Sequence, residues 1–218
     1  MKLIVVFTWT VLSLTECKVL NLKCKQIRAF VDGHNSRRLL LAEGKLKGHP
    51  GASDMKKIVW DDELATKAAE WAAGQAENDN FYQHNPSKTV PSGRFETSEN
   101  LYWYSTTDLK YKMSPETALD TWFNEHKNFT FGPLDSGHFT PGKQEVGHYT
   151  QMVWSDSIYV GCAISKKEKQ GWHNYLVVCN YGPGGNYLGS KPYETRGGAS
   201  GKLECAHKQC SRPYGKKC

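Results

Sequence analysis

The chain has 218 residues and a formal net charge of +6, with 23% charged and 39% hydrophobic side chains. This length predicts one large domain, or a domain with a small appendage, able to bury a core without disulfide support. The mild positive charge does not indicate nucleic-acid binding, because no lysine and arginine cluster alternates with aromatic residues. We therefore predict a globular protein that binds no nucleic acid.

The first residues are typical of a secretory signal peptide. Lys2 precedes the apolar stretch Leu3–Leu14, and the chain becomes polar at Thr15. The stretch is too short to cross a bilayer, which needs about 20 apolar residues, and no later segment approaches that length. We predict a signal peptide over residues 1–17 and a secreted, extracellular, monomeric protein with no transmembrane helix.

The cysteine count bears on the cleavage point. Cleavage after Cys17 leaves six cysteines, an even number suited to an oxidising compartment, whereas cleavage after Thr15 leaves an odd thiol. Cys162 and Cys179 fall on two neighbouring predicted strands, where a disulfide is geometrically reasonable. If all six pair, Cys24 bonds to one of three cysteines near the C-terminus, and the sequence leaves that partner open: Cys205, Cys210 or Cys218.

The hydrophobic periodicity and the capping residues predict four helices and three strands. Asp61 and Asp62 offer N-caps to the second helix, and Ser114-Pro115-Glu116 is a typical start for the third. We expect helices over about residues 27–44, 61–78, 114–129 and 145–154, and strands over 101–104, 158–165 and 172–181. Helices that precede paired strands, with few βαβ alternations, predict an α+β fold of packed layers.

Four polar residues fall where their surroundings predict apolar ones or a loop. Glu125 lies on the Trp122 stripe of the third helix, and His148 lies one turn before Met152 in the fourth. Buried acids and imidazoles cost free energy unless they are paired, hydrogen-bonded or bound to metal. Together with His84 and Glu99, they supply the side-chain types that a Zn²⁺ or Mg²⁺ site uses.

Spacing alone does not show that these four residues converge. No HExxH pattern occurs on any predicted helix, and spacing alone favours unrelated surface or satisfied core residues for such a set. Buried polar groups that satisfy each other are a further alternative for Glu125 and His148. Glu145, three residues before His148 on the same predicted helix, competes with Glu125 as its carboxylate partner.

Two signatures near the C-terminus carry a family resemblance: GHYTQMVW at Gly147–Trp154 and CNYGPGGNY at Cys179–Tyr187. Together with His34-Asn35-x-x-Arg38 and Ser98-Glu99-Asn100-Leu101, they resemble the CAP superfamily of cysteine-rich secretory, antigen 5 and pathogenesis-related proteins. The resemblance implies an α-β-α sandwich with a mostly antiparallel central sheet, here a CAP domain over residues 18–193. Residues 194–218 would form a short disulfide-tied tail.

In that family two histidines and two acids line a central cleft, and the histidine pair of some members holds Zn²⁺ or another divalent ion. Carried over by motif, these residues are His84, Glu99, Glu125 and His148, with His84 and His148 as the metal ligands. Ser98 replaces the glycine that usually precedes Glu99. His34 is interpreted as structural, since Asn35 and Arg38 beside it indicate a hydrogen-bonding role within the first helix.

The resemblance implies a non-enzymatic binding or effector protein that takes a lipid, a sterol, a divalent metal or a host or prey protein as its ligand. The alternative is a Zn-dependent hydrolase or protease that uses the four cleft residues, although no oxyanion donor is recognisable. An ion-channel toxin is disfavoured, because three cysteines after the CAP domain are too few for the module that such toxins carry. Asn128-Phe129-Thr130 is the sole glycosylation sequon; Asn128 should be exposed, and we expect it to be unoccupied or incidental.

Overall fold

The computed structural model describes residues 17–140, 145–206, 208–216 and 218. Its elements, in chain order, are β1 (Cys17–Val19), α1 (Cys24–Ala42), β2 (Val59–Trp60), α2 (Asp62–Glu77), β3 (Ser98–Thr106), α3 (Pro115–Asn124), the 3₁₀ turns η1 (Glu125–Asn128) and η2 (Ser136–Phe139), α4 (Gly147–Met152), β4 (Tyr159–Lys169), β5 (Trp172–Gly182) and η3 (Lys208–Ser211). No helix among the described residues is long and apolar enough to span a membrane. Of the predicted signal peptide, only Cys17 lies within the described residues.

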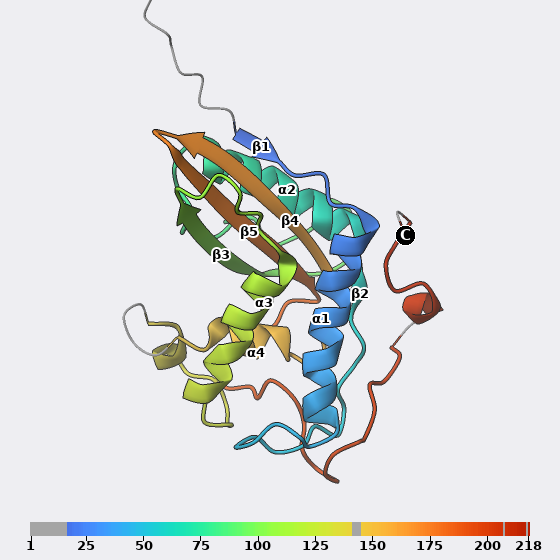
Figure 1. Ribbon diagram of the computed structural model, residues 1–218. Coiled ribbons are helices and arrows are strands. Elements are labelled where there is room, and N and C mark those ends of the chain that lie inside the picture. The colour runs from blue at the N-terminus through green and yellow to red at the C-terminus, as the bar shows by residue number, and fades with distance from the viewer. Residues whose placement is uncertain (1–16, 141–144, 207, 217) are drawn as a thin grey trace, which may run out of the picture.

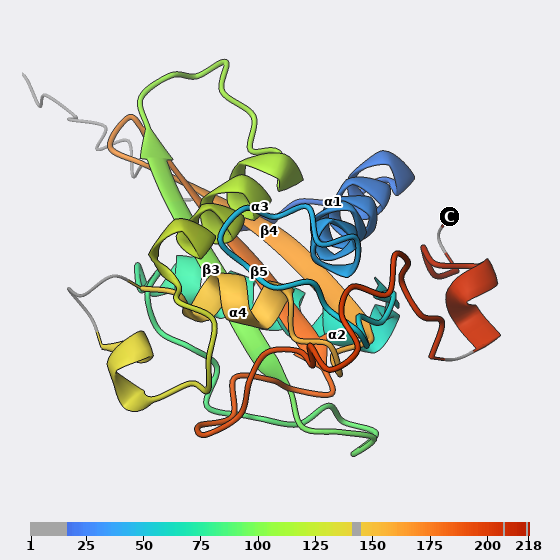
Figure 2. The same cartoon turned by 90° about the horizontal axis from the view of Figure 1, so that it is seen from below.

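One five-stranded sheet forms the middle layer of the molecule. Its order is β1-β4-β5-β3, all neighbours antiparallel, while the two-residue β2 runs parallel to β4. The helices α1 and α3 cover one face and α2 covers the other, as Figures 1 and 2 show. The fold is therefore the predicted α-β-α sandwich.

Alternation along the strands divides the core in two. Val177 and Cys179 of β5 face α1 and α3, and Leu176 and Val178 face α2, because successive side chains of a strand point to opposite faces. The Cys162–Cys179 disulfide joins two directly opposed positions of β4 and β5. The strands that carry it were predicted; β3 is longer than expected, at nine residues.

The capping residues act as expected at two helix starts. The Asp61 side chain accepts a hydrogen bond from the Leu64 backbone N–H, and Ser114 accepts one from Thr117. Two boundaries differ from the predictions. The third helix ends at Asn124, so Glu125 begins a 3₁₀ turn, and the fourth starts only at Gly147, so Glu145 precedes the helix rather than belonging to it.

Arg38 has a wider role than hydrogen bonding within the first helix. Its fully buried guanidinium donates to the backbone carbonyls of Lys56, Met152, Trp154, Ser155 and Ser157 at 2.7–3.2 Å. Asn35 likewise bonds to the backbone of Ile58. The HNxxR motif therefore ties α1 to two other segments, including the carbonyl end of α4.

Candidate functional site

Glu125 and His148 form the more enclosed of two histidine–carboxylate pairs. His148 Nδ1 lies 2.6 Å from Glu125 Oε1, and the two side chains are 24% and 15% exposed. The imidazole also stacks on the Trp122 ring, with ring centroids 6.1 Å apart and planes 14° apart. Carboxylate and indole thus fix the position and the plane of the His148 ring.

The same carboxylate caps α4. Helix-initial N–H groups lack intrahelical partners, and Val146, the N-cap residue, offers no side-chain bond. Glu125 Oε2 instead accepts from the backbone N–H groups of His148 and Tyr149, each at 3.0 Å. A negative charge at a helix N-terminus is favourable, so one side chain stabilises the helix and orients its histidine.

His84 and Glu99 form the second pair. His84 Nδ1 lies 2.9 Å from Glu99 Oε1, which also accepts from the Asn85 backbone N–H at 3.0 Å. The His84 side chain is 51% exposed, whereas that of Glu99 is 4% exposed. Glu99 Oε2 is buried and has no hydrogen-bond partner among the described residues. An unpartnered buried carboxylate oxygen is costly and favours a cation or an ordered water beside it.

The two pairs are connected through Asn100. This β3 residue follows Glu99, and its Nδ2 donates to the His148 carbonyl at 3.0 Å and to the Tyr181 hydroxyl at 3.1 Å. Tyr181 in turn contacts His34 Nε2 at 2.9 Å. Burial lowers the pKa of His34 to about 3, so this imidazole is neutral and structural.

The glycine-rich loop that follows β5 contacts the other side of α4. Asn186 donates to the Gly147 carbonyl at 2.8 Å and accepts from the Thr150 hydroxyl at 2.7 Å. Ser98, at the position where a glycine was expected, accepts from the Gly185 backbone N–H at 2.6 Å. The serine therefore holds this loop and leaves Glu99 in its place on β3.

A hollow of about 530 Å³ opens beside His84 and Glu99. Its wall includes three apolar side chains that are 38%, 49% and 63% exposed: Phe139, Tyr187 and Leu188. Phe139 and Asn186 line the hollow, and Asn186 also donates to the carbonyl of Gly147, next to His148. A polar end with a histidine and an acid thus adjoins an apolar rim.

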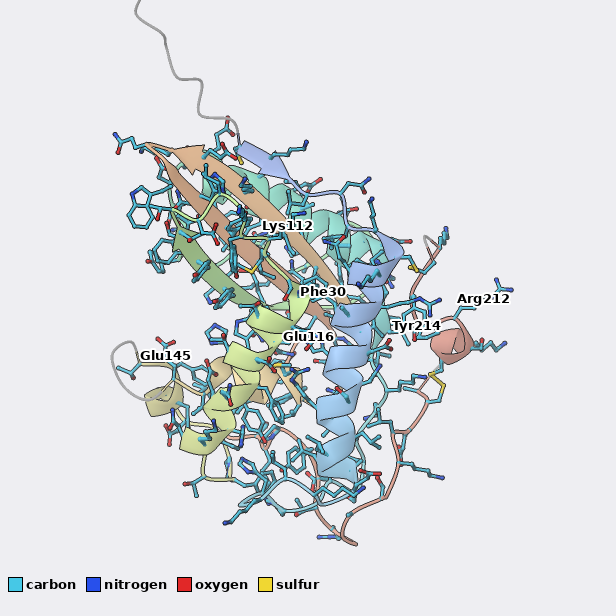
Figure 3. The ribbon with its side chains drawn as sticks, viewed as in Figure 1. Phe30, Lys112, Glu116, Glu145, Arg212 and Tyr214 are labelled. Atoms are coloured by element: carbon cyan, nitrogen blue, oxygen red, sulfur yellow. A yellow bond between two sulfur atoms is a disulfide. The ribbon has the colours of Figure 1, made fainter. Side chains whose placement is uncertain are left out.

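The four residues found from sequence occur as two hydrogen-bonded pairs that Asn100 links. Within the described residues, one set of three metal-binding side chains has ligand atoms within 4.8 Å of one another: Glu125, Glu145 and His148. Glu145 is exposed and, as Figure 3 shows, lies on the side of the molecule away from the C-terminal tail. Glu125 is the hydrogen-bonded partner of His148; the competing Glu145 lies nearby without a hydrogen bond to it in the described structure.

Comparison with known proteins places the chain in a family. Residues 31–181 match the model of the cysteine-rich secretory protein family, CAP. The chain belongs to this family. Venom allergen 5 of Rhynchium brunneum is 37% identical over 172 residues, 77% of this chain and 72% of the relative. Venom allergen 3 of Solenopsis invicta is 36% identical, covering 77% of this chain and 71% of the relative.

Solved structures agree on the fold. A crystal structure of NaASP2 with Zn²⁺ is 30% identical, covers 78% of this chain and 85% of that one, and gives a TM-score of 0.61. The structure of BmVAL-1, 24% identical, gives the same TM-score over 88% of each chain and supports the fold alone. This CAP protein thus resembles a relative whose structure was determined with zinc.

Proposed function

We propose that this CAP protein is a secreted, non-enzymatic binding protein whose cleft holds a divalent cation, Zn²⁺, at His84 and His148. The observation that carries the proposal is the pairing of both Nδ1 atoms with carboxylates. A metal-binding histidine typically gives its other ring nitrogen to a carboxylate, which fixes the tautomer and the orientation of the ring. In both histidines Nε2 forms no hydrogen bond with the described residues.

The donor set fits the ion. Imidazole nitrogens suit Zn²⁺, and Glu99 and Glu125 supply negative charge behind the two rings. Residues 1–17 would be removed on secretion, leaving residues 18–193 as the CAP domain and 194–218 as its tail. The bound cation would offer a positive centre at the polar end of the hollow.

The apolar rim points to the ligand class. Phe139, Tyr187 and Leu188 would cover an apolar body while an anionic head faces His84, which matches a lipid with an acidic group. The hollow of about 530 Å³ falls within the usual range for small-molecule sites. A host protein that presents an apolar side chain and a carboxylate would use the same chemistry.

Calorimetric titration of the purified protein with Zn²⁺ tests the metal site. We expect one ion per chain, and a loss of affinity of about tenfold or more in His84→Ala and in His148→Ala. His173→Gln, at the far end of β5, is the matched control and should bind as the unchanged protein does. Equal binding by all four proteins contradicts the proposed site.

Binding of a fluorescent fatty acid tests the rim separately. Leu188→Asp should weaken binding severalfold, and Leu109→Asp, an exposed leucine elsewhere, should have no effect. If neither variant changes binding, the ligand does not occupy this hollow. The protein would instead be a hydrolase if it cleaved peptide or ester substrates and if this cleavage required Zn²⁺ and both histidines.

A further inference from the structure

The C-terminal tail is bound to the body of the molecule by backbone hydrogen bonds. Lys57 N–H donates to the Glu204 carbonyl at 2.7 Å, and Glu204 N–H donates to the Met55 carbonyl at 2.8 Å. Farther along, Trp60 N–H donates to the Pro213 carbonyl at 2.7 Å. These contacts lead the tail along the segment before α2, and the C-terminus lies near the first turns of α1 (Figure 1).

The last residues of the tail also contact α1 and Trp60 through side chains. The Tyr214 hydroxyl donates to Asp32 Oδ1 at 2.9 Å, and the Arg28 guanidinium lies 4.4 Å from the centre of the Tyr214 ring. Tyr214 and Arg212 are labelled on the tail in Figure 3. Gly215 has φ of +72°, and a Cβ there would lie 2.8 Å from Trp60 Cδ1, so only glycine allows this close approach.

This docking brings two thiols together. Arg28 Nε donates to Cys24 Sγ at 3.3 Å, and Cys218 lines the same hollow as Arg28. The neighbouring Cys218 side chain, and after it the hydrogen bond from Arg28, lowers the pKa of Cys24. Burial, and after it the neighbouring Cys24 side chain, raises the pKa of Cys218 to about 11. Cys24 is thus the better nucleophile of the pair.

The other cysteines are occupied or lie elsewhere. Cys205 and Cys210 are bonded to each other within the tail, which removes two of the three partners that the sequence left open for Cys24. Cys17 lies in β1, where its thiol is 3.7 Å from the Ala73 carbonyl of α2. Cys218 is the remaining partner.

We propose that the secreted, oxidised protein contains a third disulfide, between Cys24 and Cys218, which fastens the C-terminal tail to the start of α1. The oxidant is a disulfide compound, either an oxidoreductase or a small disulfide such as oxidised glutathione. The Cys24 thiolate attacks one sulfur of that disulfide, forms a mixed disulfide and expels one thiolate. The Cys218 thiol, on losing its proton, attacks the Cys24 sulfur and expels the second thiolate, so the oxidant gains two electrons and two protons in all.

The bond would have a structural consequence beyond the tail itself. A hollow of about 1030 Å³ lies between the tail and the body, with walls from Ser211–Lys216 on one side and Trp60–Glu63 on the other. Fastening Cys218 to Cys24 would make this hollow a permanent feature of the surface. Reduction would leave the tail held by its hydrogen bonds alone.

Chymotrypsin separates the relevant peptides cleanly. Cleavage after Leu22, Phe30, Leu203 and Tyr214 places Cys24 in residues 23–30, the Cys205–Cys210 pair in 204–214, and Cys218 in 215–218. The secreted protein, alkylated before digestion without a reductant, should yield residues 23–30 joined to 215–218. Reduction should release the two peptides.

Alkylated Cys24 and Cys218, or either of them joined to another cysteine or to a small thiol, would overturn the proposal. A Cys218→Ser variant adds an independent readout. Its Cys24 should react with iodoacetamide in the native protein, whereas the unchanged protein should not react there. In a control with both Cys205→Ser and Cys210→Ser the linkage should persist, which excludes exchange with the tail disulfide.

Discussion

Glu125 caps a helix that it does not belong to and holds the histidine of that helix. Its Oε1 lies 2.6 Å from His148 Nδ1, while its Oε2 accepts from the His148 and Tyr149 N–H groups. The contact joins the end of α3 to the start of α4 across more than twenty residues of chain. Stability and site geometry therefore depend on the same carboxylate.

Glu125→Ala should lower both quantities. We expect a loss of about 1–3 kcal/mol in the free energy of unfolding, since two helix-initial N–H groups and an imidazole lose their acceptor. Zn²⁺ affinity should fall by about 10- to 100-fold. Denaturant unfolding and calorimetric titration measure the two effects; Glu145→Ala is the matched control and should leave both nearly unchanged. If Glu145→Ala lost as much stability and Zn²⁺ affinity as Glu125→Ala, the special role of Glu125 would be contradicted.

Arg38 and Arg37 provide a matched test of the HNxxR motif. Arg38→Met removes the buried guanidinium that donates to five backbone carbonyls, and we expect it to destabilise the protein by about 3 kcal/mol or more. Arg37 makes ion pairs with the exposed acids Glu116 and Asp120, so Arg37→Met should cost about 1 kcal/mol or less. Urea unfolding of the two variants measures the difference.

His34 predicts a specific loss of stability in acid. Its folded pKa of about 3 lies below its unfolded value of about 6.5, because the charged form is not accommodated in the core. Stability from this residue is therefore complete above about pH 6.5 and falls as pH decreases towards 3. The slope is at most about 1.4 kcal/mol per pH unit.

The His34→Gln variant isolates this effect. At each pH, the unfolding free energy of the variant is subtracted from that of the unchanged protein. This difference should decrease below about pH 6, because only the unchanged protein loses stability through His34. A difference that stays constant from pH 7 to pH 4 would show that His34 accepts a proton in the folded state. Thermal melts over this range provide the measurement.

Substitution by alanine should change stability in opposite directions at Gly161 and at Gly74. A Cβ at Gly161 of β4 would lie 2.1 Å from the Ala65 nitrogen of α2, so Gly161→Ala should force the helix away and destabilise the protein by about 3 kcal/mol or more. A Cβ at Gly74 of α2 would meet nothing within 4 Å. Gly74→Ala should therefore raise stability by about 0.5–1 kcal/mol. Melting temperatures should separate in opposite directions.

Local chemistry in the sequence predicts the start of α2 and α3 and the β4–β5 hairpin. Asp61 and Ser114 carry their own capping groups, and the apolar run of β5 is visible without the fold. The family signatures indicate the sandwich. These features depend on residues close together in the chain, where propensity and periodicity are informative.

Features that depend on distant partners are not visible in the sequence. The end of α3 at Asn124 and the late start of α4 follow from Glu125, whose capping of α4 needs the tertiary structure. The carbonyl partners of Arg38 also lie outside its own helix, so the sequence does not reveal them. Periodicity placed Glu125 and His148 on inward stripes, but only the folded chain shows His84 with Glu99 and His148 with Glu125.

The central claim is that one Zn²⁺ ion binds His84 and His148 through Nε2 while Glu99 and Glu125 hold their Nδ1 atoms. Anomalous diffraction at the zinc edge, from crystals of the protein with one equivalent of Zn²⁺, tests it most directly. We predict a single peak about 2.0–2.1 Å from both Nε2 atoms. A peak among Glu125, Glu145 and His148 without His84, or no peak at all, would contradict the claim.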